Sequence, residues 1–439
     1  MKAKKYILNF SSQFVMNLVS QAIGIFTLPY AARMLGPGKF GEFNLVLSIS
    51  GYVTILATFG FLQYASRELP RMDDVRPLVN AVRTLRLLLG FLSLGVMVVL
   101  GMVLDYSDDF LVLSIIAGAN IVLGAFDMRN VFTARDQMWR VSYLGILGSL
   151  AYAVALYLMV DSPDDIVAYG ICWMINVIVP VGVSLYLYAR HFGGMKLTLK
   201  YDKWDELKRE SVPLGLSSIT GTINAYFAGV IIGFYLTAAD LGYYSAGLRL
   251  VLLFTTLFNL VGAVVTPTIS RLYVKDRAKL LRFLQMYFLV ALLLGLSSAV
   301  ALWLLSGWVV GTLFGAEYAR STELVRIWAL FLLPLTPMSI FFTGSLIPCN
   351  GSRDYFLASL AGAVATLVSI PALLYALGLP GAPFASVAAE LTVASLGAYF
   401  LRRRLGLSAG EMRSLFNLKQ AFEQVLAVMR GKEASALEG

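Results

Sequence analysis

Long apolar runs separated by short polar breaks constrain this chain more than any other feature. A helix needs roughly 20 apolar residues to cross about 30 Å of hydrocarbon. Runs of about this length lie near 7–34, 41–62, 82–104, 110–131, 141–160, 166–189, 211–236, 241–269, 281–304, 322–347, 355–377 and 382–402. Charged residues are only 14% of the chain and hydrophobic types are 58%, so no soluble core hides this much apolar surface. We predict an all-α membrane protein with about twelve transmembrane helices.

The distribution of basic residues predicts the orientation. With the N-terminus in the cytoplasm, the cytoplasmic segments carry all of the 35 lysines and arginines except Arg33, Lys39, Arg249, Arg320 and Arg326. The opposite loops are short and acidic, with Asp105, Asp108, Asp109, Asp161, Asp164, Asp165 and Asp240. This positive-inside pattern predicts that both termini are cytoplasmic and that the protein lies in the cytoplasmic (inner) membrane. It also explains the net charge of +9 without a nucleic-acid partner.

The two halves of the chain resemble each other when the first is shifted by 201 residues. Leu35, Phe40, Gly41, Phe43 and Leu47 then fall on Leu236, Leu241, Gly242, Tyr244 and Leu248. An even number of helices gives both halves the same orientation, as in transporters with parallel repeats. We predict an N-terminal six-helix lobe (1–190), a cytoplasmic linker (191–210), a C-terminal six-helix lobe (211–404) and a cytoplasmic tail (405–439), with a cavity between the lobes.

Polar residues follow one face of the first helix of each half. The first helix carries Gln13, Asn17, Ser20, Gln21 and Gly24, and the seventh carries Ser217, Thr220, Gly221 and Asn224. Their spacing of three or four residues places each set on one helix face. Interhelical hydrogen bonding is one interpretation. We favour the other, in which Asn17, Gln21 and Asn224 line the hydrated cavity, because the stripes occupy matching helices.

Two charges lie deep in predicted helices, where burial costs at least a few kcal/mol. Arg249 is about 12 Å from its helix end at 1.5 Å per residue, and Glu390 lies at a similar depth. They form either a structural ion pair with each other or part of a cavity that binds an anionic substrate. Arg33 lies nearer the outer interface, where a charge is cheaper. The candidate substrate-binding residues are therefore Arg249, Arg33, Asn17, Gln21, Asn224 and Glu390.

No motif in the sequence supports catalysis. It contains no phosphate-binding P-loop, no paired-histidine metal motif and no G-x-S-x-G elbow. The single histidine, His191, has no neighbouring metal ligand, and Cys172 and Cys349 both lie in apolar runs. We expect neither an enzyme, a metal site nor a cofactor. Transport would then draw on an ion gradient, with H⁺ or Na⁺ as the coupling ion, or on substrate flow.

Several ordered motifs give the chain a family resemblance. Pro29-Tyr-Ala-Ala-Arg33-Met-Leu-Gly36-Pro37-Gly-Lys-Phe40-Gly41-Glu42, Phe59-Gly60-Phe61 and Arg67-Glu68-Leu69 resemble the Wzx-type polysaccharide flippases of the multidrug/oligosaccharidyl-lipid/polysaccharide exporter superfamily. The second half is similar at Leu241-Gly242-Tyr243-Tyr244-Ser245-Ala246, Thr266-Pro267, Ser270-Arg271-Leu272, Leu313-Phe314-Gly315-Ala-Glu317-Tyr318 and Gly378-x-x-Gly381-Ala382. Each motif is weak alone, but together they cover nearly the whole chain.

The resemblance implies a flippase that moves a polyprenyl-diphosphate-linked oligosaccharide to the outer leaflet by alternating access. Planar guanidinium groups suit diphosphate oxygens. A multidrug or cation exporter of the same superfamily is one alternative, although the first helix lacks the membrane acid that such exporters use. A lipid II flippase is another, although such proteins carry two extra helices. A scaffold without transport has no positive feature in the sequence.

The C-terminal tail is predicted to be amphipathic. Leu415, Leu418, Phe422, Val425 and Met429 recur at helical spacing. We expect the tail to lie on the cytoplasmic membrane surface. The alternative is a docking helix for a polysaccharide polymerase or a glycosyltransferase.

Overall fold

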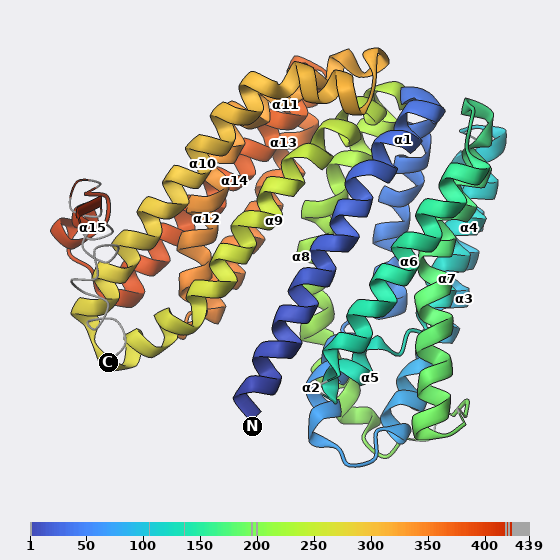
Figure 1. The fold of residues 1–439 in the computed structure, drawn as a ribbon, viewed down its shortest axis with the longest axis horizontal. Helices are drawn as coiled ribbons and strands as arrows, with labels where there is room; N and C mark the ends of the chain where they lie inside the picture. The colour runs from blue at the N-terminus through green and yellow to red at the C-terminus, as the bar shows by residue number, and fades with distance from the viewer. Residues whose placement is uncertain are drawn as a thin grey trace. The chain divides into compact units, whose positions relative to one another are not determined.

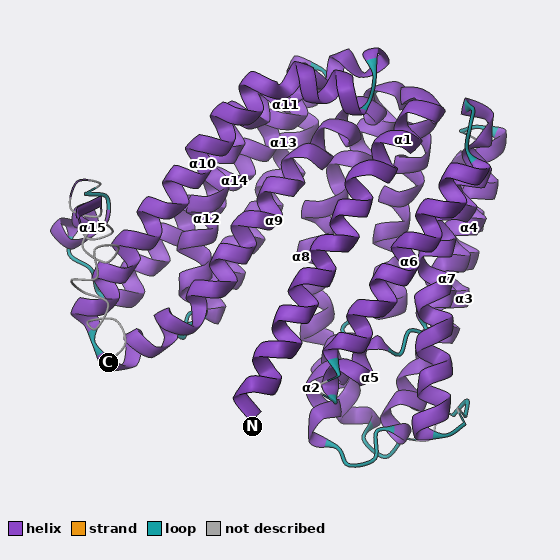
Figure 2. Ribbon diagram, in the orientation of Figure 1, coloured by secondary structure: helices purple, strands orange, loops and turns teal. Residues whose placement is uncertain are grey.

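The computed structural model describes residues 2–104, 106–135, 137–194, 196–198, 201–417, 419 and 422–423. These residues form helices and their connections, with no strand among them (Figures 1 and 2). The α-helices are α1 (Lys2–Thr58), α2 (Phe61–Glu68), α3 (Arg76–Leu104), α4 (Asp108–Gly124), α5 (Arg129–Ala134), α6 (Met138–Met159), α7 (Ile166–Phe192), α8 (Trp204–Tyr235), α9 (Ala238–Lys275), α10 (Arg277–Leu313), α11 (Ala319–Ile327), α12 (Leu333–Leu346), α13 (Ser352–Leu377), α14 (Gly381–Leu405) and α15 (Ala409–Leu415). Short 3₁₀ turns span Leu69–Arg71, Pro163–Asp165 and Ala316–Tyr318.

The number of membrane crossings agrees with the sequence. Within the described residues, 10 helical segments are long and apolar enough to cross a membrane, and Tyr143–Met159 is a shorter apolar helix. The first of the 10 contains two predicted spans, because α1 is two helices joined at a kink. The prediction of an all-α membrane protein with about twelve transmembrane helices is confirmed.

The kink in α1 lies at Gly36, whose φ of 69° and ψ of 168° are not helical. A positive φ suits glycine, which has no Cβ to clash with the backbone. Pro37 follows directly and has no backbone N–H to continue the hydrogen-bond ladder of the preceding helix. At 1.5 Å per residue, the parts of α1 before and after the kink are about 51 and 33 Å long, so each is long enough to cross a membrane, and no loop separates them.

Two predicted spans are interrupted in the structure. The span near 110–131 ends at Gly124, and α5 follows as a separate short helix. The span near 322–347 is divided by a π-helical turn at Trp328–Leu332. Pro334 and Pro337 follow this turn. Because proline cannot donate to the carbonyl four residues earlier, the widened turn accommodates the missing bonds.

The contacts divide the chain into two compact units. The first unit comprises Met1–Tyr243 and Leu313–Glu317, and the second comprises Tyr244–Thr312 and Tyr318–Gly439. Helix α8 packs along α1 and α2 in the first unit. Gly229 and Gly233 of α8 face Ser48 and Leu45 of α1 so closely that an added Cβ would lie 2.3 and 2.5 Å from those side chains. The division into lobes at 190 and 211 stays a prediction.

In the first unit, the basic connections lie at one end of the helices. The N-terminus, α2, α5 and the α7–α8 connection meet at this end, whereas the α3–α4 and α6–α7 connections lie at the other (Figure 1). Arg83 donates to the carbonyl of Lys196 at 2.8 Å at the basic end. Lys39 pairs with Asp109 at 2.6 Å at the acidic end. Arg83 and Arg86, counted above among the cytoplasmic charges, belong to α3 and are buried.

In the second unit, the basic connections also meet at one end. Arg277 begins α10 and contacts both the carbonyl of Gly406 and Glu411 of α15. Arg404 pairs with Asp354 of α13 at 2.8 Å. The α9–α10 turn, the start of α13 and the start of the tail are therefore neighbours.

Equivalent residues of the two halves contact each other in a reciprocal pair. An added Cβ at Gly41 would lie 1.7 Å from the carbonyl oxygen of Ala238, and one at Gly242 would lie 2.0 Å from that of Pro37. Under the shift of 201 residues, Gly41 corresponds to Gly242 and Pro37 to Ala238. Such a contact, in which each copy offers the same patch, is typical of a two-fold relation.

Only the beginning of the amphipathic tail is described. Leu415 is buried in a hydrophobic cluster with Leu284 and Leu407, and the ring of Phe416 lies 4.8 Å from that of Phe288. Phe422 is exposed. Leu418, Val425 and Met429 lie outside the described residues. The tail therefore starts by packing on its own unit.

Candidate functional site

The predicted substrate-binding residues fall in both units. Arg33, Gln21, Asn17 and Asn224 belong to the first unit, and Arg249 and Glu390 belong to the second. Arg33, Asn224 and Arg249 are exposed, whereas Gln21 and Glu390 are half-buried. Asn17 lies in α1, but its side chain is outside the described part of the structure.

The polar stripe of α1 does not present one continuous open face. An added Cβ at Gly145 of α6 would lie 3.8 Å from the hydroxyl oxygen of Ser20, so Ser20 faces α6. Gln21 is half-buried and Gly24 is exposed. Among the side chains of the stripe that the structure describes, Ser20 therefore packs within the first unit.

The polar stripe of α8 is more accessible. Gly221 and Asn224 are exposed, and Thr220 is buried. Near the middle of the helix, Gln63 of α2 donates to Ser218 at 3.0 Å. Near the helix end, the glycines described above face α1. Helix α8 is thus held in its middle and near its end by the first unit, and the Asn224 side chain is exposed between these contacts.

Arg249 and Glu390 do not form the ion pair that one interpretation of the sequence proposed. Arg249 is exposed on α9 and makes no ion pair with the described residues. Glu390 of α14 instead interacts with the side chain of Ser339 on α12. An exposed guanidinium without a carboxylate partner keeps its five N–H donors available for phosphate oxygens.

Arg33 lies beside the segment Leu313–Glu317, which belongs to the same unit. Its Nε would lie 3.4 Å from a Cβ added at Gly315, whose φ is 92°. An added Cβ at Gly36 would lie 3.5 Å from Glu317 Oε2. The kink of α1, with Arg33 just before it, is therefore covered by this loop at the acidic end of the first unit.

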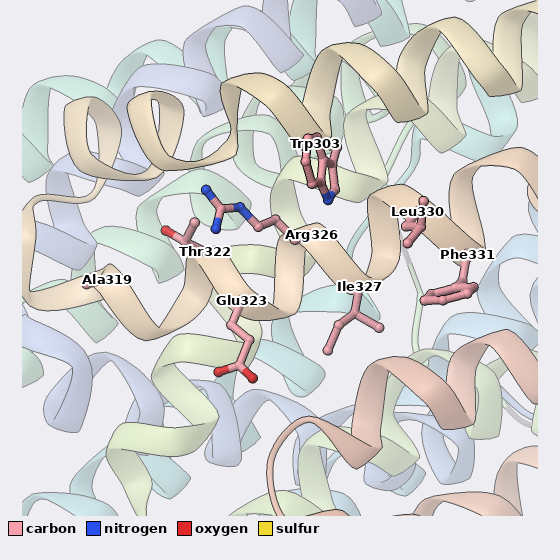
Figure 3. Close-up of a pocket in the computed structure, with 8 residues that line it drawn as sticks. All are labelled: Trp303, Ala319, Thr322, Glu323, Arg326, Ile327, Leu330 and Phe331. Carbon is pink, nitrogen blue, oxygen red and sulfur yellow. The ribbon is translucent and has the colours of Figure 1, made fainter.

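A groove in the second unit was not predicted from the sequence. It has a volume of about 540 Å³ and is lined by Trp303, Ala319, Thr322, Glu323, Arg326, Ile327, Leu330 and Phe331 (Figure 3). The Nε of Arg326 donates to the hydroxyl of Ser306 on α10 at 3.2 Å. The Glu323 side chain points away from the Arg326 side chain (Figure 3). Charged groups beside exposed aromatic rings suit an amphipathic ligand, whose polar head and apolar tail need different surroundings. The only sequence signal for this groove is the three-residue spacing of Glu323 and Arg326, which places both on one side of the helix.

The described residues contain no cluster of histidine, cysteine or carboxylate side chains that could hold a metal ion. The open polar groups are arginines and amides, which donate hydrogen bonds rather than bind metals. The chemistry available at these residues is the non-covalent binding of anionic or hydroxyl-rich molecules.

The sequence of this chain is similar to a known protein family and to two transporters. Residues 7–273 match the model of a family described as polysaccharide biosynthesis protein. A candidate O-antigen transporter of Shigella dysenteriae is 21% identical over 359 residues, which cover 80% of this chain and 88% of that protein. A second candidate O-antigen transporter, from Escherichia coli K12, is 20% identical over 390 residues, covering 86% and 92%.

The fold is similar to those of two transporters of known structure. The lipid II flippase MurJ in an inward closed conformation aligns with a TM-score of 0.76 at 14% identity, covering 95% of this chain and 92% of that one. An inward-facing MATE-family multidrug resistance transporter aligns with a TM-score of 0.69 at 16% identity, covering 90% and 94%. At these identities the likeness shows the fold alone, which the chain shares with both transporters.

Proposed function

Because the chain belongs to the polysaccharide biosynthesis protein family, we propose that it flips a polyprenyl-diphosphate-linked oligosaccharide from the inner to the outer leaflet of the cytoplasmic membrane. The product would serve surface polysaccharide synthesis. The observation that carries this proposal is the family match over residues 7–273. Similarity to candidate O-antigen transporters over 80% and 86% of the chain supports it.

The proposed orientation places both termini in the cytoplasm. The gathering of basic connections at one end of each unit supports it. A cysteine introduced at Asp108 should react with an impermeant thiol reagent added outside intact cells, whereas one at Lys279 should not. The native Cys172 and Cys349 are buried and would give little background. The opposite labelling pattern would reject the orientation.

The proposed mechanism is alternating access without chemistry on the substrate. Arg249 and Arg33 would bind the diphosphate, and Asn17, Gln21, Asn224 and Glu390 would contact the sugar or water. The exposure of Arg249, Arg33 and Asn224 supports these roles, because a bound substrate must reach their donors. We propose H⁺ or Na⁺ as the coupling ion and no cofactor.

Deletion of the gene tests the proposed function. Cells without the protein should lose surface polysaccharide and accumulate the lipid-linked oligosaccharide in the inner leaflet. Purified protein in proteoliposomes should restore movement of that lipid, measured by its accessibility to an external lectin. Normal surface polysaccharide in the deletion strain would contradict the proposal.

Two other functions of the same fold make different predictions. A lipid II flippase would restore growth to cells depleted of their own lipid II flippase, as the likeness to MurJ allows. A multidrug exporter would lower sensitivity to cationic dyes, as the likeness to the MATE transporter allows. We expect neither result, since the family match concerns polysaccharide biosynthesis.

Arg249 gives the sharpest test of the binding residues. We expect Arg249→Ala to be produced and inserted normally but to abolish export, because a cation for the diphosphate is lost. Arg249→Lys should rescue only partly, since a point charge replaces a planar fork. Arg353→Ala, which removes an exposed arginine from the start of α13, is the matched control and should export normally.

The same series tests the rival structural role. If Arg249 stabilised the fold with Glu390, Arg249→Ala would lower protein abundance, and removing both charges would restore it. Normal export by a well-produced Arg249→Ala protein would contradict the binding role.

A further inference from the structure

Two arginines near the start of α3 are unusually buried. Arg83 and Arg86 are 5% and 7% exposed. Three residues apart, they lie on neighbouring positions of one helix face. At 1.5 Å per residue they lie about 10 and 15 Å from the start of α3, where its apolar run begins. They therefore lie where the predicted membrane span near 82–104 begins.

Both side chains line a small cavity, the arginine cavity. Its volume is about 40 Å³, and it is lined by Leu62, Ala65, Leu69, Val79, Val82, Arg83, Arg86, Ala125, Asp127, Met128, Asn130 and Val131. A single water needs about 10–15 Å³ of such space. The cavity is therefore large enough for a polar group bigger than one water, inside walls that are otherwise mostly apolar.

The described lining of this cavity carries more positive than negative charge. The one carboxylate in the lining, Asp127, is already held by two nitrogens of Arg129 at 2.6–2.9 Å. Arg83 gives one bond to the carbonyl of Lys196 at 2.8 Å, and its buried Nε has no acceptor. The buried Nε of Arg86 also has none, and Arg86 makes no ion pair with the described residues. Asp127 is thus the one carboxylate in the described lining that faces two buried guanidiniums, and its oxygens already bind Arg129.

We propose that the arginine cavity is a binding site for a phosphate group. An uncompensated buried charge is strongly destabilising, and a bound anion would remove this cost. Guanidinium forks match phosphate oxygens, and Asn130 in the lining adds amide donors. The headgroup of an anionic phospholipid is one source of this group, since basic pockets between helices at the cytoplasmic side bind such headgroups. Inorganic phosphate is the other.

The site is separate from the residues proposed to carry the transported lipid. Arg33 lies at the acidic end of the first unit, and Arg249 belongs to the second unit. The arginine cavity lies at the basic end, among α2, α3 and α5. It would bind a resident ligand that stabilises this end, whatever substrate the protein moves.

The proposal is tested by thermal unfolding of the purified full-length protein in a neutral detergent. Phosphatidylglycerol and phosphatidylcholine with the same acyl chains are added in separate concentration series, and inorganic phosphate in a third. For the wild type, phosphatidylglycerol should raise the unfolding temperature more than phosphatidylcholine does. A shift with inorganic phosphate as well would assign the site to phosphate itself, whereas a shift with phosphatidylglycerol alone would assign it to the lipid headgroup.

Variants separate this site from general attraction to a basic surface. Arg86→Met should weaken the anion-dependent shift by roughly tenfold to a hundredfold in concentration, the usual effect of losing hydrogen bonds to a charged group. Arg76→Gln removes an arginine from the same helix that pairs with Asp74 at 2.8 Å outside the cavity. This control should keep the wild-type response.

A loss of folding is distinguishable from a loss of the site. Without added anions, Arg86→Met should unfold no earlier than the wild type, because it removes an uncompensated charge. Arg86→Lys keeps the charge without the fork and should bind more weakly than the wild type. The proposal is overturned if the wild type, Arg86→Met and Arg86→Lys respond alike to both anions, or if Arg76→Gln loses as much as Arg86→Met.

Discussion

Helices α3 and α10 begin at equivalent arginines but bury opposite kinds of side chain. Arg76 and Arg277 are their first residues and are 201 positions apart. Seven and ten residues later, α3 carries Arg83 and Arg86, whereas α10 carries Leu284 and Tyr287. All four side chains are buried. One repeat therefore closes this end of its bundle with apolar groups, while the other keeps charges inside.

The surroundings of the two helices explain how each choice is tolerated. In the second unit, Tyr287 and Phe288 pack on Phe341 with ring centroids 5.1 and 5.4 Å apart. The tail covers this cluster, since Gln285 donates to the carbonyl of Ser414 at 2.7 Å. In the first unit, the arginine cavity remains between the helices. The second unit thus closes this end with apolar packing, whereas the first unit holds the arginine cavity that we propose as a phosphate site.

The largest expected effect on stability comes from exchanging the residue types at the equivalent positions Arg83 and Leu284. Leu284→Arg would place a charge without an acceptor in the apolar cluster and cost about 3–5 kcal/mol, the usual penalty for an unpaired buried charge. Arg83→Leu, the reverse change at the equivalent position, should be neutral or stabilising in neutral detergent. Thermal unfolding followed by size-exclusion chromatography measures both. Leu284→Met is the control, and equal losses for Leu284→Arg and Arg83→Leu would refute the contrast.

A smaller loss of stability is expected at Gly41 and Gly242, where both repeats have a glycine. Gly41→Ala and Gly242→Ala would each force a Cβ against a backbone carbonyl of the other repeat and should cost about 1–3 kcal/mol, as overpacking does. The two losses should be similar because the contact is reciprocal. Gly38→Ala, where an added Cβ meets nothing within 4 Å, should be harmless. Unequal melting temperatures for the two glycine variants would count against the two-fold relation.

The contact of the tail with the second unit should be worth less. Phe416 is 39% exposed, and its ring meets that of Phe288 edge to face. Phe416→Ala should lower stability by about 0.5–1.5 kcal/mol, the range for one aromatic pair. Phe422→Ala, at an exposed position, should change the unfolding temperature little. A larger loss for Phe422→Ala would show that the covering segment is a different one.

The smallest effect is a pH dependence of α15. The backbone N–H of Ser408 holds the pKa of Glu411 below its usual value, helped by the Ser408 hydroxyl and by Arg277. Because this pKa is lowered in the folded protein, the cap stabilises α15 above the ordinary glutamate pKa of about 4.3. That stability is lost as the pH falls through the lowered value. A spin label at Arg413 should become more mobile in acid, and Glu411→Gln should remove this dependence.

The sequence predicted the membrane class, the crossings and the grouping of basic connections. These features depend on the composition of whole segments, because a lipid bilayer selects apolar spans and excludes charges. Apolar runs of spanning length and charges that avoid hydrocarbon are visible without coordinates. The Gly41–Gly242 correspondence was also visible, although not the contact that those residues make. The break at Trp328–Leu332 was missed because hydropathy does not register how prolines redistribute backbone hydrogen bonds.

The candidate site could be predicted only in part. The sequence identified Arg249 and Glu390 as deep charges but could not decide whether they pair, since that depends on how α9 and α14 are rotated about their axes. Arg83 and Arg86 were counted among the cytoplasmic charges, and such a count does not show whether a side chain points into the helix bundle.

By itself, then, the sequence determined that the chain crosses the membrane about twelve times in two related halves. Only the tertiary structure decided which charges face inward. A helix shows its composition in the sequence, but the neighbours of each side chain come from segments far away in the chain. Two examples are Arg86, which lines a cavity with Asp127, and Leu284, which is buried in one cluster with Leu415.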